Sequence, residues 1–109
     1  MKKFINLTPH DVNLVMESGT ISIPKSGEIA RVGATTETIG EIDGIPVVRT
    51  TFNPAEVTGL PEPQDEVIFI TSTLVAQAVA GIRDDVLVPA NLVRDENGVI
   101  IGAAALQRL

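Results

Sequence analysis

The sequence predicts an α+β fold: a mostly antiparallel or barrel-like sheet of short strands with one short helix at residues 73–82. Three observations predict it. Val, Ile and Thr are abundant in this chain of 109 residues, and they favour strands. The pairs Asp43-Gly44 and Asn97-Gly98 each separate two β-like runs, which is a strong hairpin signal. One stretch, LVAQAVAGI, has the broad apolar face of a helix. The length indicates a single domain, residues 1–109.

The first half of the chain is expected to form short strands joined by turns. Pro9 lies in the first expected bend, and proline interrupts strand pairing because it has no N–H to donate. The expected strands are residues 4–7, 12–16, 21–23, 28–32, 36–42 and 45–52. The last two flank Asp43-Gly44 and are rich in threonine, so we expect one face of this hairpin to contact water.

The second half is expected to hold the helix between two strands. Residues 53–65 carry three of the seven prolines and should form an irregular connection. The elements expected after it are a central strand at 66–71, the helix at 73–82, a strand at 86–88 and a hairpin of 91–94 with 99–106. The helix and its two strands can form a crossover between parallel strands, which we favour, or the helix can cap the open end of a barrel.

Composition excludes several classes of site. The chain has no cysteine and one histidine, so disulfides, thiolate metal sites, cysteine nucleophiles and multi-histidine metal sites are excluded. We expect no metal and no cofactor. A net charge of −6 with eight scattered Lys and Arg residues argues against nucleic-acid and anionic-membrane partners. No segment reaches the ~20 apolar residues of a membrane span, and the start does not match a signal peptide, so we expect a cytoplasmic protein.

Several short motifs occur together along the chain. They are Asn6-Leu7-Thr8-Pro9-His10, Ser26-Gly27 with Ala30-Arg31, Gly59-Leu60-Pro61-Glu62-Pro63, and Val93-Arg94-Asp95 with Gly98, Ile101 and Gly102. As a set they resemble a group of small, mostly uncharacterised proteins of bacteria, prophages and bacteriophages. The resemblance spans most of the chain and implies an intracellular protein that a phage can carry. It implies no activity and no catalytic residue.

Three hydroxyl residues, Thr71, Ser72 and Thr73, follow an apolar run at the point where the helix should begin. A helix N-terminus has unpaired N–H groups and a partial positive charge, so it attracts phosphate or carboxylate groups. Helix capping by Ser72 or Thr71 explains the same residues without a ligand. The glycines and the lysine of a P-loop are missing. Two interpretations therefore stay open, an anion site and a capped helix.

Three more residues complete the candidate ligand site. Arg83 and Arg94 are expected to hold an anion if they converge near Ser72, because guanidinium groups bind phosphate bidentately. The alternative is that they pair with acidic residues across strands. His10, the only histidine of the chain, lies in the bend after Pro9, so it is either a ligand contact or a turn residue that bonds its own backbone. No nucleophile elbow is present, and no catalytic residue is assigned.

The sequence supports two function hypotheses ahead of an enzyme. The first is a non-enzymatic protein that binds a small anionic, nucleotide-like ligand and, if phage-borne, sequesters a signalling nucleotide. The alternative is a structural or interaction protein that self-assembles and binds a protein partner without a small ligand. The uncharged run 99–106 and a mean hydropathy of +0.27 predict a homo-oligomer, most simply a two-fold dimer. Its interface should include the final hairpin or the small-residue face of the helix.

Overall fold

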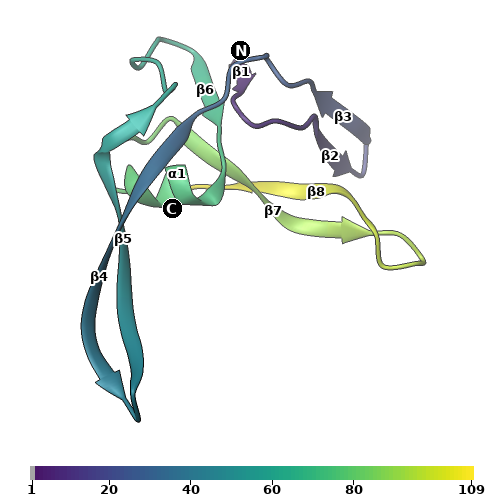
Figure 1. Cartoon of the computed structure of the whole chain (residues 1–109). Coiled ribbons are helices and arrows are strands. Elements are labelled where there is room, and N and C mark those ends of the chain that lie inside the picture. The colour runs from purple at the N-terminus through teal and green to yellow at the C-terminus, as the bar shows by residue number, and fades with distance from the viewer. Residues whose placement is uncertain (1) are drawn as a thin grey trace.

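The computed structural model describes residues 2–109 as a chain built mostly of strands with one short helix (Figure 1). Met1, the first residue of the expected domain 1–109, lies outside the described residues. The elements are β1 (Lys3–Asn6), β2 (Val12–Met16), β3 (Gly19–Ile23), β4 (Arg31–Ile42), β5 (Ile45–Thr58), β6 (Val67–Ile70), α1 (Thr73–Ala78), β7 (Val86–Arg94) and β8 (Ile100–Gln107). The prediction of many short strands with a single short helix is confirmed, and strands dominate more strongly than an α+β label suggests.

Six strands form one sheet in the order β1-β6-β7-β8-β2-β3. The pairs β7–β8 and β2–β3 are antiparallel, whereas β1–β6, β6–β7 and β8–β2 are parallel. This sheet is therefore mixed, whereas the sequence suggested mostly antiparallel pairing. The two longest pairings of the chain are antiparallel: β7–β8 in this sheet and β4–β5, which forms a separate sheet. Hairpin signals predict only partners that are neighbours in the sequence. β1 pairs with β6, and β2 pairs with β8 as well as with its neighbour β3. No local turn determines the direction of the pairings with β6 and β8.

The sheet curls so that its two edge strands approach each other at one end. The main-chain oxygen of Asn6, at the end of β1, accepts hydrogen bonds from the N–H and the hydroxyl of Ser26, at 3.0 and 2.7 Å. Asn6 also forms an isolated parallel bridge with Lys25, just beyond the end of β3. The result is a half-barrel, which agrees in part with the barrel-like sheet that the sequence predicted.

β6, α1 and β7 form the predicted crossover, because β6 and β7 are adjacent and parallel. The helix ends at Ala78, however, and not at residue 82 as the sequence suggested. The N–H groups of Ile82 and Arg83 both donate to the carbonyl of Val79 at 3.0 Å, and Gly81 has a φ of +80°. These residues therefore form a turn that ends the helix early.

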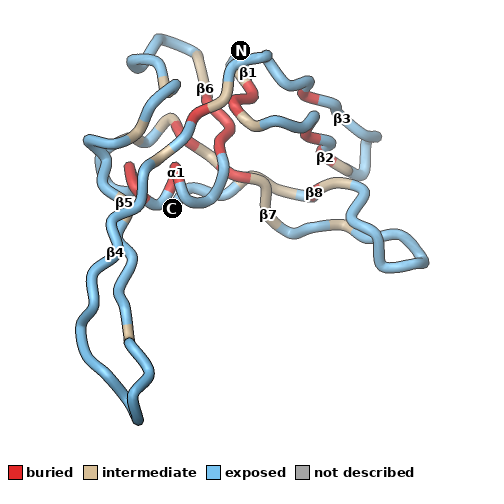
Figure 2. The backbone as a smooth tube through the Cα atoms, in the orientation of Figure 1, coloured by how far each residue is buried: buried red, intermediate tan, exposed pale blue. Residues whose placement is uncertain are grey.

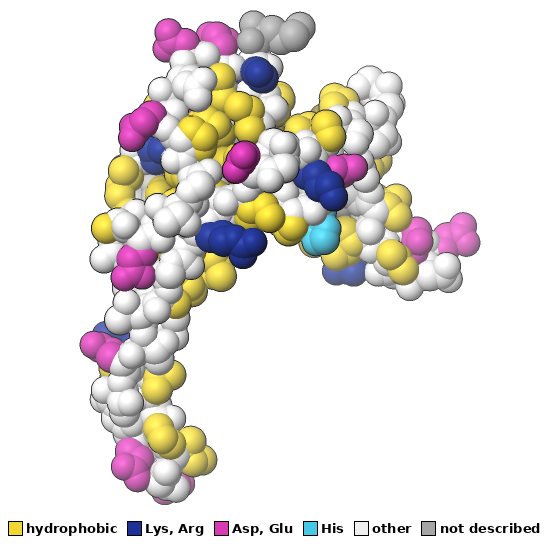
Figure 3. Space-filling model, turned by 45° about the horizontal axis from the view of Figure 1, so that its top comes forward, with side chains coloured by type: hydrophobic (Ala, Val, Ile, Leu, Met, Phe, Trp, Pro, Cys, Tyr) yellow, Lys and Arg dark blue, Asp and Glu magenta, His cyan; other side chains and the backbone are white. Residues whose placement is uncertain are grey.

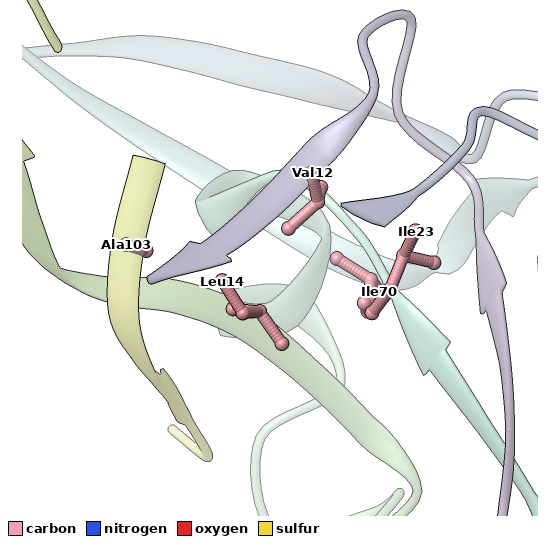
Figure 4. Close-up of a cluster of buried hydrophobic side chains, with 5 residues drawn as sticks. All are labelled: Val12, Leu14, Ile23, Ile70 and Ala103. Carbon is pink, nitrogen blue, oxygen red and sulfur yellow. The ribbon is translucent and has the colours of Figure 1, made fainter. Parts of the chain in front are cut away.

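The core is mostly aliphatic, as the composition predicts, and the ring of Phe69 is buried among the aliphatic side chains. One cluster lies between β2, β3, β6 and β8 and consists of Val12, Leu14, Ile23, Ile70 and Ala103 (Figure 4). A second cluster surrounds Phe69, and a third packs Ala76 and Val79 on Val86 and Val88 of β7. Burying one of the larger side chains, such as Leu14 or Phe69, stabilises the fold by about 1.5–3 kcal/mol. A helix of six residues is too short to persist alone, so this packing holds it in place.

β4 and β5 form a two-stranded hairpin that projects from the body of the molecule; we call it the arm (residues 31–58; Figures 1 and 2). Its turn residues Asp43 and Gly44 have φ values of +50° and +82°, as the predicted hairpin requires. Figure 2 shows the arm exposed over nearly its whole length. The radius of gyration is 16.6 Å, against about 13 Å for a compact domain of this length. The arm therefore makes the molecule extended.

The arm is longer than the sequence suggested. β5 continues to Thr58, through residues that were expected to form an irregular connection. The strand register shifts near Gly33, so that residues 53–56 bulge out of the ladder. Pro54 lies in this bulge, where its missing N–H removes no ladder hydrogen bond. A proline-containing segment can therefore extend the hairpin down to the core, where Val32 and Val57 pack.

Candidate functional site

The three hydroxyl residues at the start of α1 do not face a common site. Thr71 is fully buried; its N–H donates to the carbonyl of Leu87 at 3.1 Å, and its hydroxyl donates to the carbonyl of Ser72 at 3.0 Å. Ser72 is the N-cap, and its hydroxyl oxygen accepts from the N–H of Val75 at 3.4 Å. Thr73 is exposed as the first helical residue. Capping thus accounts for Ser72, and Thr71 belongs to the core.

Arg83 is held in a network of hydrogen bonds. Its Nε and Nη2 donate to the two carboxylate oxygens of Asp85, each at 2.9 Å, and Nη2 also donates to the carbonyl of Pro61 at 2.9 Å. The guanidinium carbon lies 6.0 Å from the centre of the Phe69 ring. The hydrogen bonds lower the pKa of the Asp85 carboxyl and raise the pKa of Arg83, while burial opposes both shifts. Arg83 is therefore a paired arginine that fastens the connection before β6 to the crossover.

Arg94 ends β7 and lies at the turn of the final hairpin. Its Nη1 donates to the carbonyl of Gly98 at 3.0 Å. In the same turn the carboxylate of Asp95 accepts from the N–H groups of Asn97 and Val99, at 2.8 and 3.0 Å. Arg94 thus stabilises the turn, and it does not line the hollow that contains Ser72.

A hollow of about 300 Å³ brings Ser72 together with a different arginine, Arg31, and we call it the Arg31 hollow. Its lining residues are Leu7, Thr8, Pro9, Ile29, Ala30, Arg31, Val32, Ser72 and Leu74. Within the described part of the chain, no hydrogen bond or ion pair engages the Arg31 guanidinium. Sequence reasoning placed Arg83 and Arg94 near Ser72 instead, because nothing in the local pattern of Arg31 distinguishes it from the other arginines beside strands.

A second hollow, of about 250 Å³, contains His10, and we call it the His10 hollow. Its lining residues are Thr8, His10, Asp11, Val12, Asn13, Pro89, Leu92, Ile100, Gly102 and Ala103. Thr8 borders both hollows. The carbonyl of His10 accepts from the amide of Asn6 at 2.8 Å and from the hydroxyl of Thr8 at 2.9 Å, which holds the bend in place. The lining is mostly apolar and suits a hydrophobic side chain better than an anion.

Large hydrophobic side chains are exposed on both projecting parts of the molecule. They are Ile39, Ile42, Ile45 and Val48 on the arm, and Leu92, Val99, Ile100 and Ile101 on the final hairpin. We call residues 39–48 the arm tip. Figure 3 shows hydrophobic side chains gathered on one side of the lower arm and acidic side chains on the opposite side. The sequence pointed to the final hairpin or the small-residue face of the helix as the interface; of the small residues on that face, Ala76 is buried, whereas Ala80 and Gly81 are exposed.

Among residues 2–109, no group of three or more His, Asp or Glu side chains is placed to hold a metal ion. The same part of the chain contains no helix that is long and apolar enough to cross a membrane. A comparison with protein-family models, with curated proteins and with solved structures finds no match for this chain.

Proposed function

We propose that this chain is an interaction protein that self-assembles through its arm and acts by binding rather than by catalysis. The observation that carries this proposal is the amount of exposed surface. The chain exposes 7343 Å², whereas a compact monomer of 11.5 kDa exposes about 5,800 Å². The excess of roughly 1,500 Å² is larger than the ~800 Å² that each partner buries in an interface of standard size.

The arm is the part of the chain that a partner would cover. A two-stranded hairpin alone in water is at best marginally stable, yet β4 and β5 are 12 and 14 residues long. Its root packs on the core through Val32 and Val57. Its tip exposes Ile42 and Ile45, by 64% and 65%, and exposed apolar clusters of this kind mark contact surfaces. Covering the arm would therefore stabilise it and remove apolar surface from water.

The molar mass in solution tests self-assembly directly. Light scattering at tens of micromolar should give about twice the chain mass of 11.5 kDa, because closed two-fold pairs are the commonest assemblies. A mass of one chain at that concentration would contradict the proposal. We place this assembly in the cytoplasm of a bacterial or phage-infected cell, since the chain has no cysteine and the sequence motifs resemble those of phage proteins.

A second candidate function is the binding of a small anionic ligand, such as a nucleotide-like metabolite, in the Arg31 hollow. The observation that favours it is the unengaged Arg31 guanidinium in a hollow that Ser72 also lines. A guanidinium group binds phosphate oxygens through two parallel hydrogen bonds. A phage-borne protein with such a site would sequester a signalling nucleotide, and that extension rests on the motif resemblance alone.

Thermal unfolding with and without phosphate-containing nucleotides tests the second candidate. A ligand that binds only the folded state raises the melting temperature. Arg31→Gln should abolish that rise, whereas Arg49→Gln, which removes the same charge from an exposed site on the arm, should keep it. An unchanged rise in Arg31→Gln would exclude the Arg31 hollow as the anion site.

A further inference from the structure

We infer that the partner of the arm is a second copy of this chain, and that Ile42 and Ile45 at the arm tip enter the His10 hollow of that copy. The inference rests on the self-assembly proposed above and adds the two surfaces that meet. Each copy would then give its arm to the other and receive the other's arm in return.

The donor surface is a pair of isoleucines at the end of the arm. Ile42 and Ile45 are directly opposite each other in the β4–β5 register, on either side of the Asp43-Gly44 turn. Opposite residues of an antiparallel pair project from the same face of the ribbon, with their Cβ atoms about 5 Å apart. Both side chains are nearly two-thirds exposed. Together they form one compact apolar projection.

The acceptor surface has the size and polarity that this projection needs. The His10 hollow measures about 250 Å³. A methyl or methylene group takes up about as much room as a water molecule, so the hollow has space for aliphatic side chains. Val12 and Ala103, both buried, lie at its base, while Leu92 and Ile100 are exposed at its edge. A hydrophobic occupant would cover these edge residues as well.

The arm of the same chain is not placed to fill this hollow. Figures 1 and 3 show the arm tip and the β7–β8 hairpin at separate ends of the molecule, in two different orientations. The principal extents of 54 × 39 × 23 Å agree with this separation. The occupant must therefore come from another molecule, and every copy of the chain carries both the isoleucine pair and the hollow. A two-fold axis satisfies both surfaces of both copies at once and closes the assembly.

Charged side chains lie beside both surfaces. Glu41 and Asp43 lie next to the isoleucine pair at the arm tip. Arg94 is the cross-strand neighbour of Ile100 at the edge of the hollow. Asp11 also lines the hollow, but its carboxylate already accepts a hydrogen bond from the N–H of Lys25 at 2.9 Å. Asp95 and Glu96 follow Arg94 in the same turn, so the charges beside the hollow are of both signs, and the contact rests on apolar burial rather than on charge.

Cysteine cross-linking tests which surfaces meet, because the chain has no cysteine of its own. Chains with Ile42→Cys and chains with Leu92→Cys are refolded together and oxidised. A disulfide requires Cα atoms within about 7 Å, so the mixture should give a cross-linked pair that neither variant gives alone. Cross-linking of Ile42→Cys with itself, and not with Leu92→Cys, would mean that arms pack on arms. That outcome would overturn this inference and leave self-assembly intact.

Light scattering of exposed-surface variants gives an independent measurement. The double variant Ile42→Ser with Ile45→Ser should halve the apparent mass. Ile82→Ser is the matched control, since Ile82 is also 65% exposed but lies outside both surfaces, and it should keep the mass of the wild type. A double variant that remains dimeric overturns the arm–hollow contact. A monomeric wild type overturns both this inference and the proposed function.

Discussion

At the scale of single residues, Asn6 closes the curled sheet. Its side chain is 1% exposed, and the amide nitrogen donates to the carbonyls of His10 at 2.8 Å and Ile23 at 3.1 Å. The amide oxygen accepts from the N–H and the hydroxyl of Thr8, at 2.9 and 2.6 Å. Every hydrogen-bonding group of the amide thus has a partner. One buried side chain joins the bend after β1 to the end of β3.

Asn6→Asp removes the two donors and keeps the shape of the side chain. A carboxylate oxygen would then face two carbonyl oxygens, so the free energy of unfolding should fall by about 3 kcal/mol. Urea unfolding measures this change, with Asn97→Asp as the control at an exposed position outside both hollows. The control should lie within about 0.5 kcal/mol of the wild type. Equal stability of Asn6→Asp and the control would show that the hydrogen bonds donated by the Asn6 amide are not needed for stability.

The Arg83–Asp85 pair predicts a pH dependence of stability. The pKa of Asp85 lies below its usual value of 3.8 in the folded chain, because Arg83 donates hydrogen bonds to it. A carboxyl with a depressed pKa stabilises the fold above its unfolded pKa, and this contribution is lost as the pH falls through the folded pKa. Arg83→Gln should therefore lower the free energy of unfolding by about 2 kcal/mol at neutral pH.

The gap between wild type and Arg83→Gln should narrow below about pH 4, as Asp85 becomes protonated in both. Urea unfolding of both proteins at neutral and acidic pH measures this gap, and other carboxyl groups cancel in the difference. A gap of constant size across the range would mean that Arg83 acts through its contacts with Pro61 and Phe69 instead.

At the scale of elements, Gly59 sets how the arm leaves the body. It follows β5 with a φ of +79°, and a Cβ there would overlap the carbonyl oxygen of Ile29. Gly59→Ala should therefore lower the free energy of unfolding by about 3 kcal/mol or more, since strain and backbone overlap add. Gly27→Ala is the control: its φ of +95° carries the same kind of strain, but no atom lies within 4 Å of the added carbon.

Gly27→Ala should cost about 1–2 kcal/mol. Chemical unfolding of both variants separates the two effects. If the two variants lose the same free energy of unfolding, the contact between the added carbon and the Ile29 carbonyl costs nothing beyond the backbone strain. The backbone near Gly59 would then be able to shift to make room for a side chain.

At the scale of the whole molecule, assembly should make stability depend on protein concentration. Partner binding to the folded state raises the melting temperature as the concentration increases. The wild type should therefore melt at a higher temperature when its concentration is raised about a hundredfold. The double variant Ile42→Ser with Ile45→Ser should melt at a nearly constant temperature. A flat profile for the wild type, measured by calorimetry, would contradict assembly through the arm.

Much of the candidate site could not be predicted from the sequence. Ser72 was predicted as a helix cap and is one, because a cap depends only on residues a few positions apart. Thr71 looked equally available, but the strand pairing of β6 with β7 turns its side chain into the core. Arg31 joins Ser72 although 41 positions separate them in the sequence, and no local pattern encodes that meeting.

The sequence by itself determined the strand content, the Asp43-Gly44 hairpin and the crossover around α1. Each of these depends on periodicity, turn residues or caps within a short window, where backbone sterics and local hydrogen bonds decide. Only the tertiary structure decided that β1 lies beside β6, that β2 lies beside β8 and that the arm projects without cover. Those features depend on hydrogen bonds and apolar contacts between distant segments, which compete across the whole chain and leave no signature in any one stretch of it.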